Sequence, residues 1–264
     1  MKKILCFLAL TVLASTVFAC QSNDVINAWE EIETRGYFIV GLDDTFAPMG
    51  FRDQEGTLVG FDVDLAKEVS IRLGVDVRFQ PIDWDAKVLE LNSGTIDMIW
   101  NGLTITDSRL EEMSFSIPYL GNRQIIMVKE SSLLTSMDDL IGKTVGVQIS
   151  SASDDAVTQS GIFSQLGNYE RYDTFNLALI ELSNGTIDAV VIDEIMGRYI
   201  ISQNPEEYKV LNDNFGLETY GIGFRLESTD IRDRINQVLS EMINDGTAAE
   251  ISVKWFGEDI FLRS

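Results

Sequence analysis

The chain alternates short apolar runs with amphipathic stretches over most of its length. Apolar residues three to four positions apart indicate helices, and compact apolar runs bounded by turn residues indicate strands. On this basis, strands are predicted over residues 37–42, 77–81, 144–148 and 189–192, and helices over residues 61–73, 85–92 and 175–184, with another beginning near Thr106. Strands that alternate with helices are typical of an α/β fold with a substantially parallel sheet.

A short repeat marks both halves of the chain. Residues 91–99 read LNSGTIDMI, and residues 182–190 read LSNGTIDAV. In each copy a helical stretch is stopped by Gly94 or Gly185, and the Thr-Ile-Asp that follows enters a buried apolar strand. Two similar α/β lobes that each bring a strand end to a shared cleft would produce this arrangement, since such strand ends are where α/β sheets bind ligands. A chance likeness at a common helix-to-strand turn explains it equally well.

The first twenty residues have the pattern of an export signal. Lys2 and Lys3 precede a largely apolar stretch, residues 4–19, which ends in small residues before Cys20. We predict that residues 1–19 are a signal peptide that is removed on export. A buried N-terminal helix is the alternative, but such a helix carries polar residues along one face, and few polar residues interrupt this stretch.

Cys20 becomes the first residue after cleavage and the only cysteine, because Cys6 leaves with the signal. No intramolecular disulfide is then possible. Residues 17–20, Val-Phe-Ala-Cys, resemble the lipobox of bacterial lipoproteins, although Phe18 is bulkier than that motif usually carries. The resemblance implies a diacylglycerol on the Cys20 thiol and a membrane anchor, because two acyl chains suffice for stable attachment. An ordinary secreted protein with an unpaired cysteine is the alternative.

Composition and charge exclude several classes of function. The loss of two lysines with the signal takes the formal charge from −22 to −24, and so negative a protein repels the phosphates of nucleic acids. The chain has no histidine, no GxSxG elbow and no P-loop, which excludes histidine-based triads and histidine metal sites. With 42 acidic residues a carboxylate pair stays open, but no EF-hand spacing indicates calcium. We therefore predict no catalytic residue, no metal site and no cofactor.

A polar segment follows the first copy of the repeat. Residues 100–109, WNGLTITDSR, leave an apolar strand, pass through a glycine-containing loop and enter the helix near Thr106. Arg109 lies in the first turn of that helix, where a cation opposes the helix dipole and needs either a carboxylate neighbour such as Glu112 or a bound anion. Residue types alone favour a surface salt bridge. Beside loop amides and Thr104, however, the arginine fork also suits a carboxylate ligand.

The second half of the chain offers two further polar positions. A predicted strand leads into Ser150, Ser151 and Ser153, whose hydroxyls form a possible anion seat together with helix N-terminal amides. Simple N-capping needs only one of these serines and is the alternative. Asp193 directly follows another predicted strand, where a carboxylate suits an ammonium group. Capping of the next helix explains Asp193 equally well.

Three motifs carry a resemblance to a known family. They are GFDVDLA at residues 60–66, NGLTITDSR at 101–109 and FSIPY at 115–119. Together they resemble the amino-acid-binding proteins of polar amino-acid ABC importers (solute-binding protein family 3), which include glutamine-, histidine- and arginine-binding proteins. The resemblance covers residues 37–256, nearly all of the predicted mature chain, with the motifs in order.

The resemblance implies an α/β protein with the two-lobed type II periplasmic-binding-protein fold. Each lobe is a sheet flanked by helices, a hinge of two crossing strands joins the lobes, and the ligand is enclosed between them. The crossings are expected near residues 119–122 and 218–221. The first lobe would then comprise residues 24–118 plus 222–264, and the second lobe residues 123–217. A monomer is expected.

The resemblance also assigns binding residues by position. The ligand α-carboxylate would be bound by Gly102, Thr104 and Arg109, helped by Ser151 and Ala152. Asp193 corresponds to the acceptor for the α-ammonium group. The residues expected around the ligand side chain are Asp43, Phe46, Trp84, Asn101 and Gln148. One departure concerns Ser150, which stands where relatives commonly have glycine and puts the backbone approach of this loop to the ligand in question.

These assignments imply an extracytoplasmic substrate-binding lipoprotein that delivers a free amino acid to the permease subunits of an ABC transporter. Its lipidated Cys20 would hold it on the membrane, in the periplasm or on the outer face of the cell membrane. Asp43 beside the aromatic faces of Phe46 and Trp84 favours a planar cationic side chain. Arginine is therefore the first expected ligand, followed by glutamine, lysine and histidine, with cystine more distant. If the two aromatics are core residues and Asp43 caps a turn, specificity is left unexplained.

Two other functions stay open. A few enzymes resemble this fold, among them periplasmic dehydratases of cyclohexadienyl acids, which also act on carboxylates without a histidine. The aspartate at position 193 and the lipobox-like Cys20 favour a receptor over such an enzyme. A sensor that signals amino-acid binding to a membrane partner is the third possibility.

Overall fold

The computed structural model describes residues 27–263. The predicted signal peptide over residues 1–19, Cys20 and the first three residues of the predicted first lobe lie outside the described residues, so export and lipidation stay predictions. Between residues 27 and 263, no helix combines the length and the apolar character that crossing a bilayer requires.

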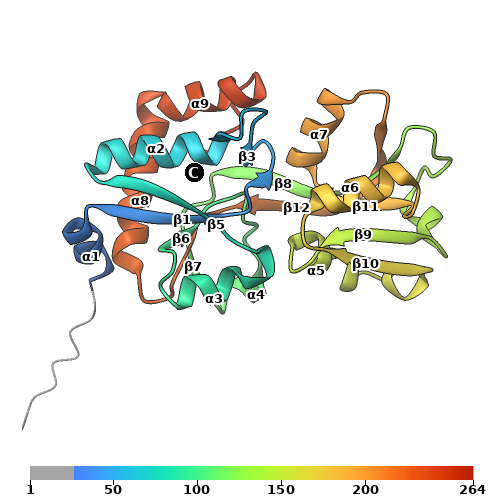
Figure 1. Ribbon diagram of the computed structural model, residues 1–264, viewed down its shortest axis with the longest axis horizontal. Helices are drawn as coiled ribbons and strands as arrows, with labels where there is room; N and C mark the ends of the chain where they lie inside the picture. The colour runs from blue at the N-terminus through green and yellow to red at the C-terminus, as the bar shows by residue number, and fades with distance from the viewer. Residues whose placement is uncertain (1–26, 264) are drawn as a thin grey trace, which may run out of the picture.

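The first lobe is built on a five-stranded sheet. Its strand order is β5-β1-β6-β13-β7, in which β1 pairs parallel with β5 and β6, and β13 pairs antiparallel with β6 and β7. The strands are β1 (Tyr37–Leu42), β5 (Asp76–Pro81), β6 (Met98–Ile99), β7 (Ser114–Phe115) and β13 (Gly223–Phe224). In Figure 1, helices α2 (Phe61–Leu73) and α9 (Thr247–Phe256) lie above this sheet, and α3 (Lys87–Asn92) and α4 (Asp107–Leu110) lie below it.

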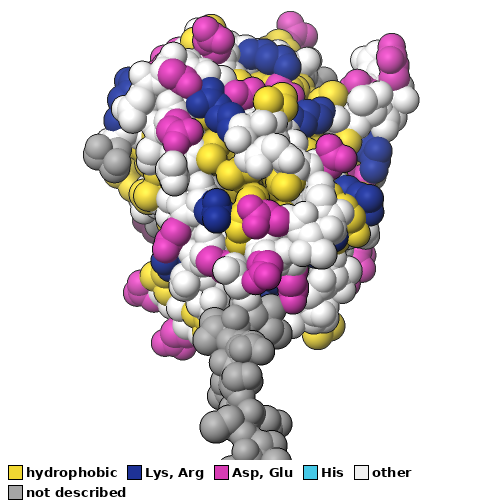
Figure 2. All heavy atoms as spheres, turned by 90° about the vertical axis from the view of Figure 1, so that its left-hand side faces the viewer, with side chains coloured by type: hydrophobic (Ala, Val, Ile, Leu, Met, Phe, Trp, Pro, Cys, Tyr) yellow, Lys and Arg dark blue, Asp and Glu magenta, His cyan; other side chains and the backbone are white. Residues whose placement is uncertain are grey.

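Smaller elements complete this lobe. Helix α1 (Ala28–Arg35) packs against α8 (Thr229–Asp245) at the outer end of the molecule. A three-stranded sheet contacts α2 and consists of β2 (Thr45–Phe46), β3 (Gly50–Arg52) and β4 (Leu58–Val59). Figure 2 looks onto the outer end of the lobe, where acidic and basic side chains are interspersed. This face therefore carries no concentrated charge of either sign.

The second lobe has its own five-stranded sheet, in the order β10-β9-β11-β8-β12. β9 pairs parallel with β10 and β11, and β8 pairs antiparallel with β11 and β12. The strands are β8 (Leu120–Lys129), β9 (Thr144–Gln148), β10 (Asn168–Tyr172), β11 (Ala189–Asp193) and β12 (Tyr208–Tyr220). The helices of this lobe are α5 (Ala152–Thr158), α6 (Phe175–Asn184) and α7 (Glu194–Gln203). It also contains the 3-10 turns η2 (Met137–Leu140) and η3 (Phe163–Gln165), and the first lobe contains the 3-10 turn η1 (Trp84–Ala86).

Strands β8 and β12 connect the two lobes. They pair antiparallel as far as Leu120 and Tyr220, and the chain enters the first lobe directly beyond this pair. There the backbone amide of Gly221 donates to the Leu103 carbonyl at 2.9 Å, which joins the crossing to the first lobe. The predicted type II fold with a hinge of two crossing strands is thus confirmed. The residue boundaries of the two lobes stay a proposal.

Local sequence signals account for most element boundaries. Helix α2 begins and ends where predicted, with Phe61, Leu65 and Val69 buried, and Gly74 ends it in the left-handed conformation at φ 70°. The helix predicted over residues 85–92 differs from the structure. There the segment begins as the 3-10 turn η1 and becomes α-helical only at Lys87. Two predicted strands are one residue longer in the structure, at the start of β5 and at the end of β11.

The two copies of the sequence repeat occupy equivalent places in the two lobes. Ile96 in the first lobe packs on Gly41 of β1, where an added Cβ would lie 2.4 Å from its side chain. Ile187 occupies the equivalent place on Gly146 of β9, at 2.6 Å. The two repeat aspartates also match, because the carboxylate of Asp97 accepts from the amide of Ile39 at 2.7 Å and that of Asp188 accepts from Thr144 at 2.9 Å. Each copy docks a strand beside a parallel neighbour, so both strands end at the cleft.

Candidate binding site between the two lobes

One cavity between the lobes brings together every predicted binding residue. Its lining residues are Asp43, Phe46, Trp84, Asn101, Gly102, Thr104, Arg109, Gln148, Ser151, Ala152, Phe175 and Asp193. Eleven of these were assigned from the sequence, and Phe175 was not. The roles assigned to the eleven stay predictions, because shared lining shows proximity and not binding.

Arg109 supplies a buried cation to this cavity. Its residue is only 5% exposed, and its guanidinium donates to the carbonyl of Thr104 at 2.8 Å and to that of Ser150 at 3.3 Å. The surface salt bridge that residue types alone favour is therefore wrong, since Arg109 forms no ion pair with any described residue. Burial lowers the pKa of the guanidinium from its usual value. A buried cation without a carboxylate partner is suited to an anionic group of a ligand.

The loop after β6 is shaped by Gly102. Its φ of 57° lies in the left-handed region, and an added Cβ would lie 2.8 Å from the Phe46 ring and 3.1 Å from the Tyr220 ring. The amide of Gly102 donates to the carboxylate of Asp62 at 2.7 Å, so this amide is already occupied. The neighbouring Asn101 accepts from the Asp43 amide at 3.1 Å through its side-chain oxygen. Its Nδ2 is buried beside Gly50 and has no partner among the described residues.

In the second lobe, Ser151 is a helix cap as well as a lining residue. Its hydroxyl accepts from the amide of Asp154 at 3.1 Å and donates to the carbonyl of Gln148 at 2.7 Å. The Ser151 hydroxyl therefore both donates and accepts within the protein. Of the two explanations left open by the sequence, N-capping and an anion seat, the structure shows N-capping. Ser150 adopts φ 56°, a left-handed conformation that serine rarely takes. Ser150 thus adopts a backbone conformation that glycine takes more readily.

Asp193 does not cap the next helix, although it occupies the N-cap position of α7. Its Oδ1 instead accepts from Asn122 at 2.7 Å, from Gln124 at 2.9 Å and from the Tyr220 hydroxyl at 2.7 Å. Burial, followed by the nearby charge of Glu218, raises the pKa of Asp193 to about 7. The carboxylate is held at the cavity wall by neutral donors, and no cation compensates it within ion-pair distance among the described residues.

Two members of the site were missed by the sequence reasoning. Glu218, on the crossing strand β12, accepts from the Thr104 hydroxyl at 2.9 Å and shares the amide groups of Asn122 and Gln124 with Asp193. No motif marks Glu218, and only the pairing of the crossing strands brings it there. Phe175 is the first residue of a correctly predicted helix, and its ring lies 5.9 Å from that of Phe46 across the cleft. A buried helix-start aromatic is indistinguishable from a core residue in the sequence.

Both carboxylate oxygens of Asp43 accept hydrogen bonds within the protein. One oxygen accepts from the amide and hydroxyl of Thr45, at 2.9 and 2.6 Å, which is the turn-capping role. The other oxygen accepts from Nε2 of Gln148 in the second lobe at 2.7 Å. The turn-capping role of one oxygen is therefore present, the ligand-facing role of Asp43 stays a prediction, and the donor beside the second oxygen is neutral.

An acidic cavity of about 440 Å³ adjoins this end of the site and shares Asp43 and Trp84 with it. Its carboxylates are contributed by Asp43, Asp44, Asp83, Asp85, Glu90 and Asp173, and no lysine or arginine lines it. A recess lined by one sign of charge concentrates ions of the opposite sign. The end of the site at Asp43 and Trp84 is therefore suited to a cationic group.

Comparison with known proteins places these features in a family. Residues 38–258 match the model of family 3 of the bacterial extracellular solute-binding proteins. An L-cystine-binding protein of Escherichia coli K12 is 30% identical over 232 residues, which cover 87% of this chain and 86% of that protein.

Two solved structures are similar over almost their whole length. A substrate-binding protein of an ABC uptake transporter from Streptococcus pneumoniae, solved with bound histidine, is 38% identical with a TM-score of 0.87 and covers 90% of this chain and 99% of its own. An ancestral arginine-binding protein bound to arginine is 41% identical with a TM-score of 0.80, over 84% of this chain and 99% of its own.

Proposed function

This chain belongs to family 3 of the bacterial extracellular solute-binding proteins, and from that premise we propose that it is the amino-acid receptor of an ABC importer. It binds one free amino acid between its lobes and delivers it, chemically unchanged, to permease subunits. The observation that carries the proposal is that Arg109 of the first lobe and Asp193 of the second line one cavity. A zwitterion matches this pair, with its carboxylate on the guanidinium and its ammonium group on the aspartate.

The second element of the proposal is the ligand side chain, for which arginine is the first choice. Phe46, Trp84 and Phe175 line the cavity, and the acidic recess begins at Trp84. A guanidinium is planar and cationic, so it suits both the aromatic faces and the carboxylates. The two similar structures described above were solved with arginine and with histidine, and the relative in Escherichia coli is named for L-cystine. Glutamine, lysine and histidine follow arginine, and cystine is more distant.

The third element is attachment to the membrane. Residues 1–19 act as the signal peptide, and the mature protein, a monomer, is anchored through lipidated Cys20. The lobes comprise residues 24–118 plus 222–264 and residues 123–217. A receptor held close to its permease needs no enzymatic function, and the residues of the cavity are explained by binding alone.

A thermal-shift screen of the twenty amino acids tests the ligand class, because a ligand that binds only the folded state raises the melting temperature. Calorimetric titration then ranks arginine, lysine, glutamine, histidine, cystine, glutamate and leucine. We expect arginine to bind most tightly and glutamate and leucine not to bind. Tight binding of glutamate or leucine, without competition from basic or amide ligands, would refute the assignment. Conversion of prephenate or arogenate to an aromatic product would identify an enzyme instead.

A further inference from the structure

The carbonyl of Ser150 in the second lobe accepts hydrogen bonds from two cations of the first lobe. Lys87 donates to it from Nζ at 2.8 Å, and Arg109 donates from Nη2 at 3.3 Å. Figure 1 shows the elements involved, with α3 and α4 of the first lobe opposite α5 of the second. A second bond from Lys87 to the carbonyl of Trp84, at 3.0 Å, fixes the ammonium group on its own lobe. The ammonium group of Lys87 therefore joins a carbonyl of the first lobe to a carbonyl of the second lobe.

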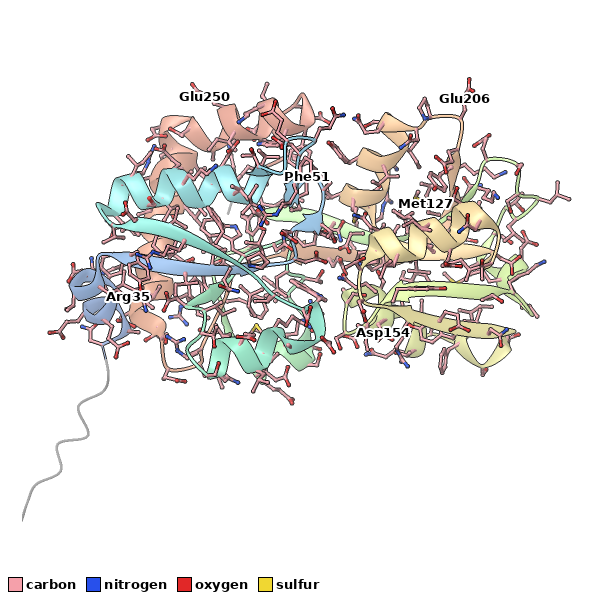
Figure 3. The ribbon with its side chains drawn as sticks, viewed as in Figure 1. Arg35, Phe51, Met127, Asp154, Glu206 and Glu250 are labelled. Carbon is pink, nitrogen blue, oxygen red and sulfur yellow. The ribbon has the colours of Figure 1, made fainter. Side chains whose placement is uncertain are left out.

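The backbone of Ser150 is arranged to present this carbonyl. Ser150 is the only residue other than glycine with a positive φ between residues 27 and 263, and such a conformation costs about 1 kcal/mol or more for a residue with a side chain. The amide of Ser150 donates to the carboxylate of Asp154 at 3.1 Å, and Arg171 holds that carboxylate at 2.9 Å. Figure 3 shows Asp154 on the side of the second lobe that faces the first. Strain that the surroundings maintain in this way indicates a functional position.

The two cations differ in their relation to the ligand. Arg109 lines the binding cavity, whereas Lys87 does not, although it is only 5% exposed. Burial of an ammonium group is costly unless it is hydrogen-bonded, and the carbonyls of Trp84 and Ser150 supply those bonds. The next two residues after Ser150 are Ser151 and Ala152, which line the cavity. A bond that holds Ser150 therefore also holds the loop that lines the cavity.

We propose that Lys87 is a positioning residue, which bonds the Ser150 carbonyl across the cleft and thereby sets the affinity for the amino acid without contacting it. The inference rests on the proposed function, because it concerns closure over a ligand between the lobes. In the open form the ammonium group loses Ser150 and is hydrated. In the closed form it returns to the buried position between the two carbonyls.

The burial of Lys87 makes closure of the lobes depend on pH. Burial, followed by the charge of Arg109, lowers the pKa of Lys87 to about 7, against the partial compensation of Asp155, Glu112 and Asp85. Opening hydrates the amine and restores a pKa near the usual value of about 10.4. The closed form thus holds fewer protons than the open form between these values, so closure releases a proton and becomes more favourable as the pH rises above about 7. A neutral amine still donates to the Ser150 carbonyl.

The test compares Lys87→Met with Lys67→Met, a matched loss of one lysine from the exposed face of α2. Titration with L-arginine should show roughly 10- to 100-fold weaker binding for Lys87→Met, because the closed form loses a buried hydrogen bond across the cleft, and native affinity for Lys67→Met. Lys87→Arg, which keeps a donor, should recover part of the loss. Equal affinities of Lys87→Met and wild type would overturn the inference and leave the proposed function intact. A wild-type protein that binds no amino acid would overturn both.

A measurement on the wild-type protein tests the inference even if the Lys87→Met variant fails to fold. Titration with L-arginine near pH 8.5, in two buffers of different ionisation enthalpy, should reveal a proton released on binding. At this pH Asp193, with its pKa of about 7, is already ionised and contributes little. Lys87→Arg should abolish the release, since arginine does not titrate in this range. Binding by the wild type without proton release would contradict burial of Lys87 on closure.

Discussion

Replacement of Arg109 with alanine should nearly abolish amino-acid binding while leaving the protein folded. Of the five N–H donors of the guanidinium, two serve the carbonyls of Thr104 and Ser150, which leaves three for a ligand. Three donors suffice for a two-point bond to a carboxylate. Truncation of one partner of such a buried charged pair costs about 2 to 5 kcal/mol, which corresponds to about 30- to 4000-fold in affinity.

The folded state should tolerate this change. Loss of two hydrogen bonds removes about 1 kcal/mol each, but the Ser150 carbonyl keeps the bond from Lys87. Removal of the cation also relieves the cost of burying a charge that no carboxylate compensates. These contributions oppose each other, so the melting temperature without ligand should move by only a few degrees.

Calorimetric titration with L-arginine measures the loss, and small-angle scattering shows whether the protein still becomes more compact on binding. Arg232→Ala is the matched control, because Arg232 lies on α8 and pairs with the exposed Asp233. Near-native affinity in a folded Arg109→Ala variant would refute the assignment of Arg109 to the ligand carboxylate. Identical scattering with and without saturating ligand in the wild type would count against lobe closure.

Three further predictions concern single positions. Burial raises the native pKa of Asp193 to about 7, so the native state binds a proton more tightly than the unfolded state between about pH 4 and 7. Burial raises the pKa of Asp62 to about 7 as well, so the melting temperature without ligand should fall as the pH rises through this range, and Asp193→Asn should remove only the part of the fall that Asp193 contributes. The same substitution should weaken arginine binding at pH 8. Ser150→Gly should raise the stability to urea by about 1 kcal/mol and keep the affinity, since glycine adopts φ 56° without strain; a loss of stability would show that the serine side chain stabilises the loop. Gly41→Ala should lower the free energy of unfolding by about 1 to 3 kcal/mol, because the added Cβ would overlap Ile96. Gly161→Ala, with open space around it, should change this free energy little. Equal urea midpoints for the two variants would contradict the packing argument.

Local sequence signals sufficed for most of the fold. The predicted limits of β1, β9 and α6 agree with the structure, because turn residues and a C-terminal glycine mark these ends in the sequence itself. The start of α3 was wrong, since Trp84 turns into the cleft and its segment forms a 3-10 turn. The apolar spacing of this segment does not distinguish a 3-10 turn from the first turn of an α-helix.

The binding site required tertiary information at the points where the lobes meet. Glu218 and Lys87 belong to no motif, and their importance arises from partners far along the chain, Asn122 for the first and Ser150 for the second. The family resemblance located the lining residues but not the bonds among them. Thus Asp43 was expected beside the ligand, whereas its bond to Gln148 appeared only in the structure.

The bond between Asp43 and Gln148 changes the reason for preferring a cationic ligand. A hydrogen-bond donor is already present at the carboxylate, so the need for a donor no longer selects the ligand. Charge still does, because the amide of Gln148 is neutral and leaves the negative charge of Asp43 uncompensated. In the proposed function Arg109 and Asp193 balance the charges of the amino-acid backbone, and the charged residues that line the adjoining recess are all acidic. A ligand with a cationic side chain is therefore the one that neutralises this end of the cavity, and glutamine ranks below arginine because its amide would duplicate the donor that Gln148 supplies.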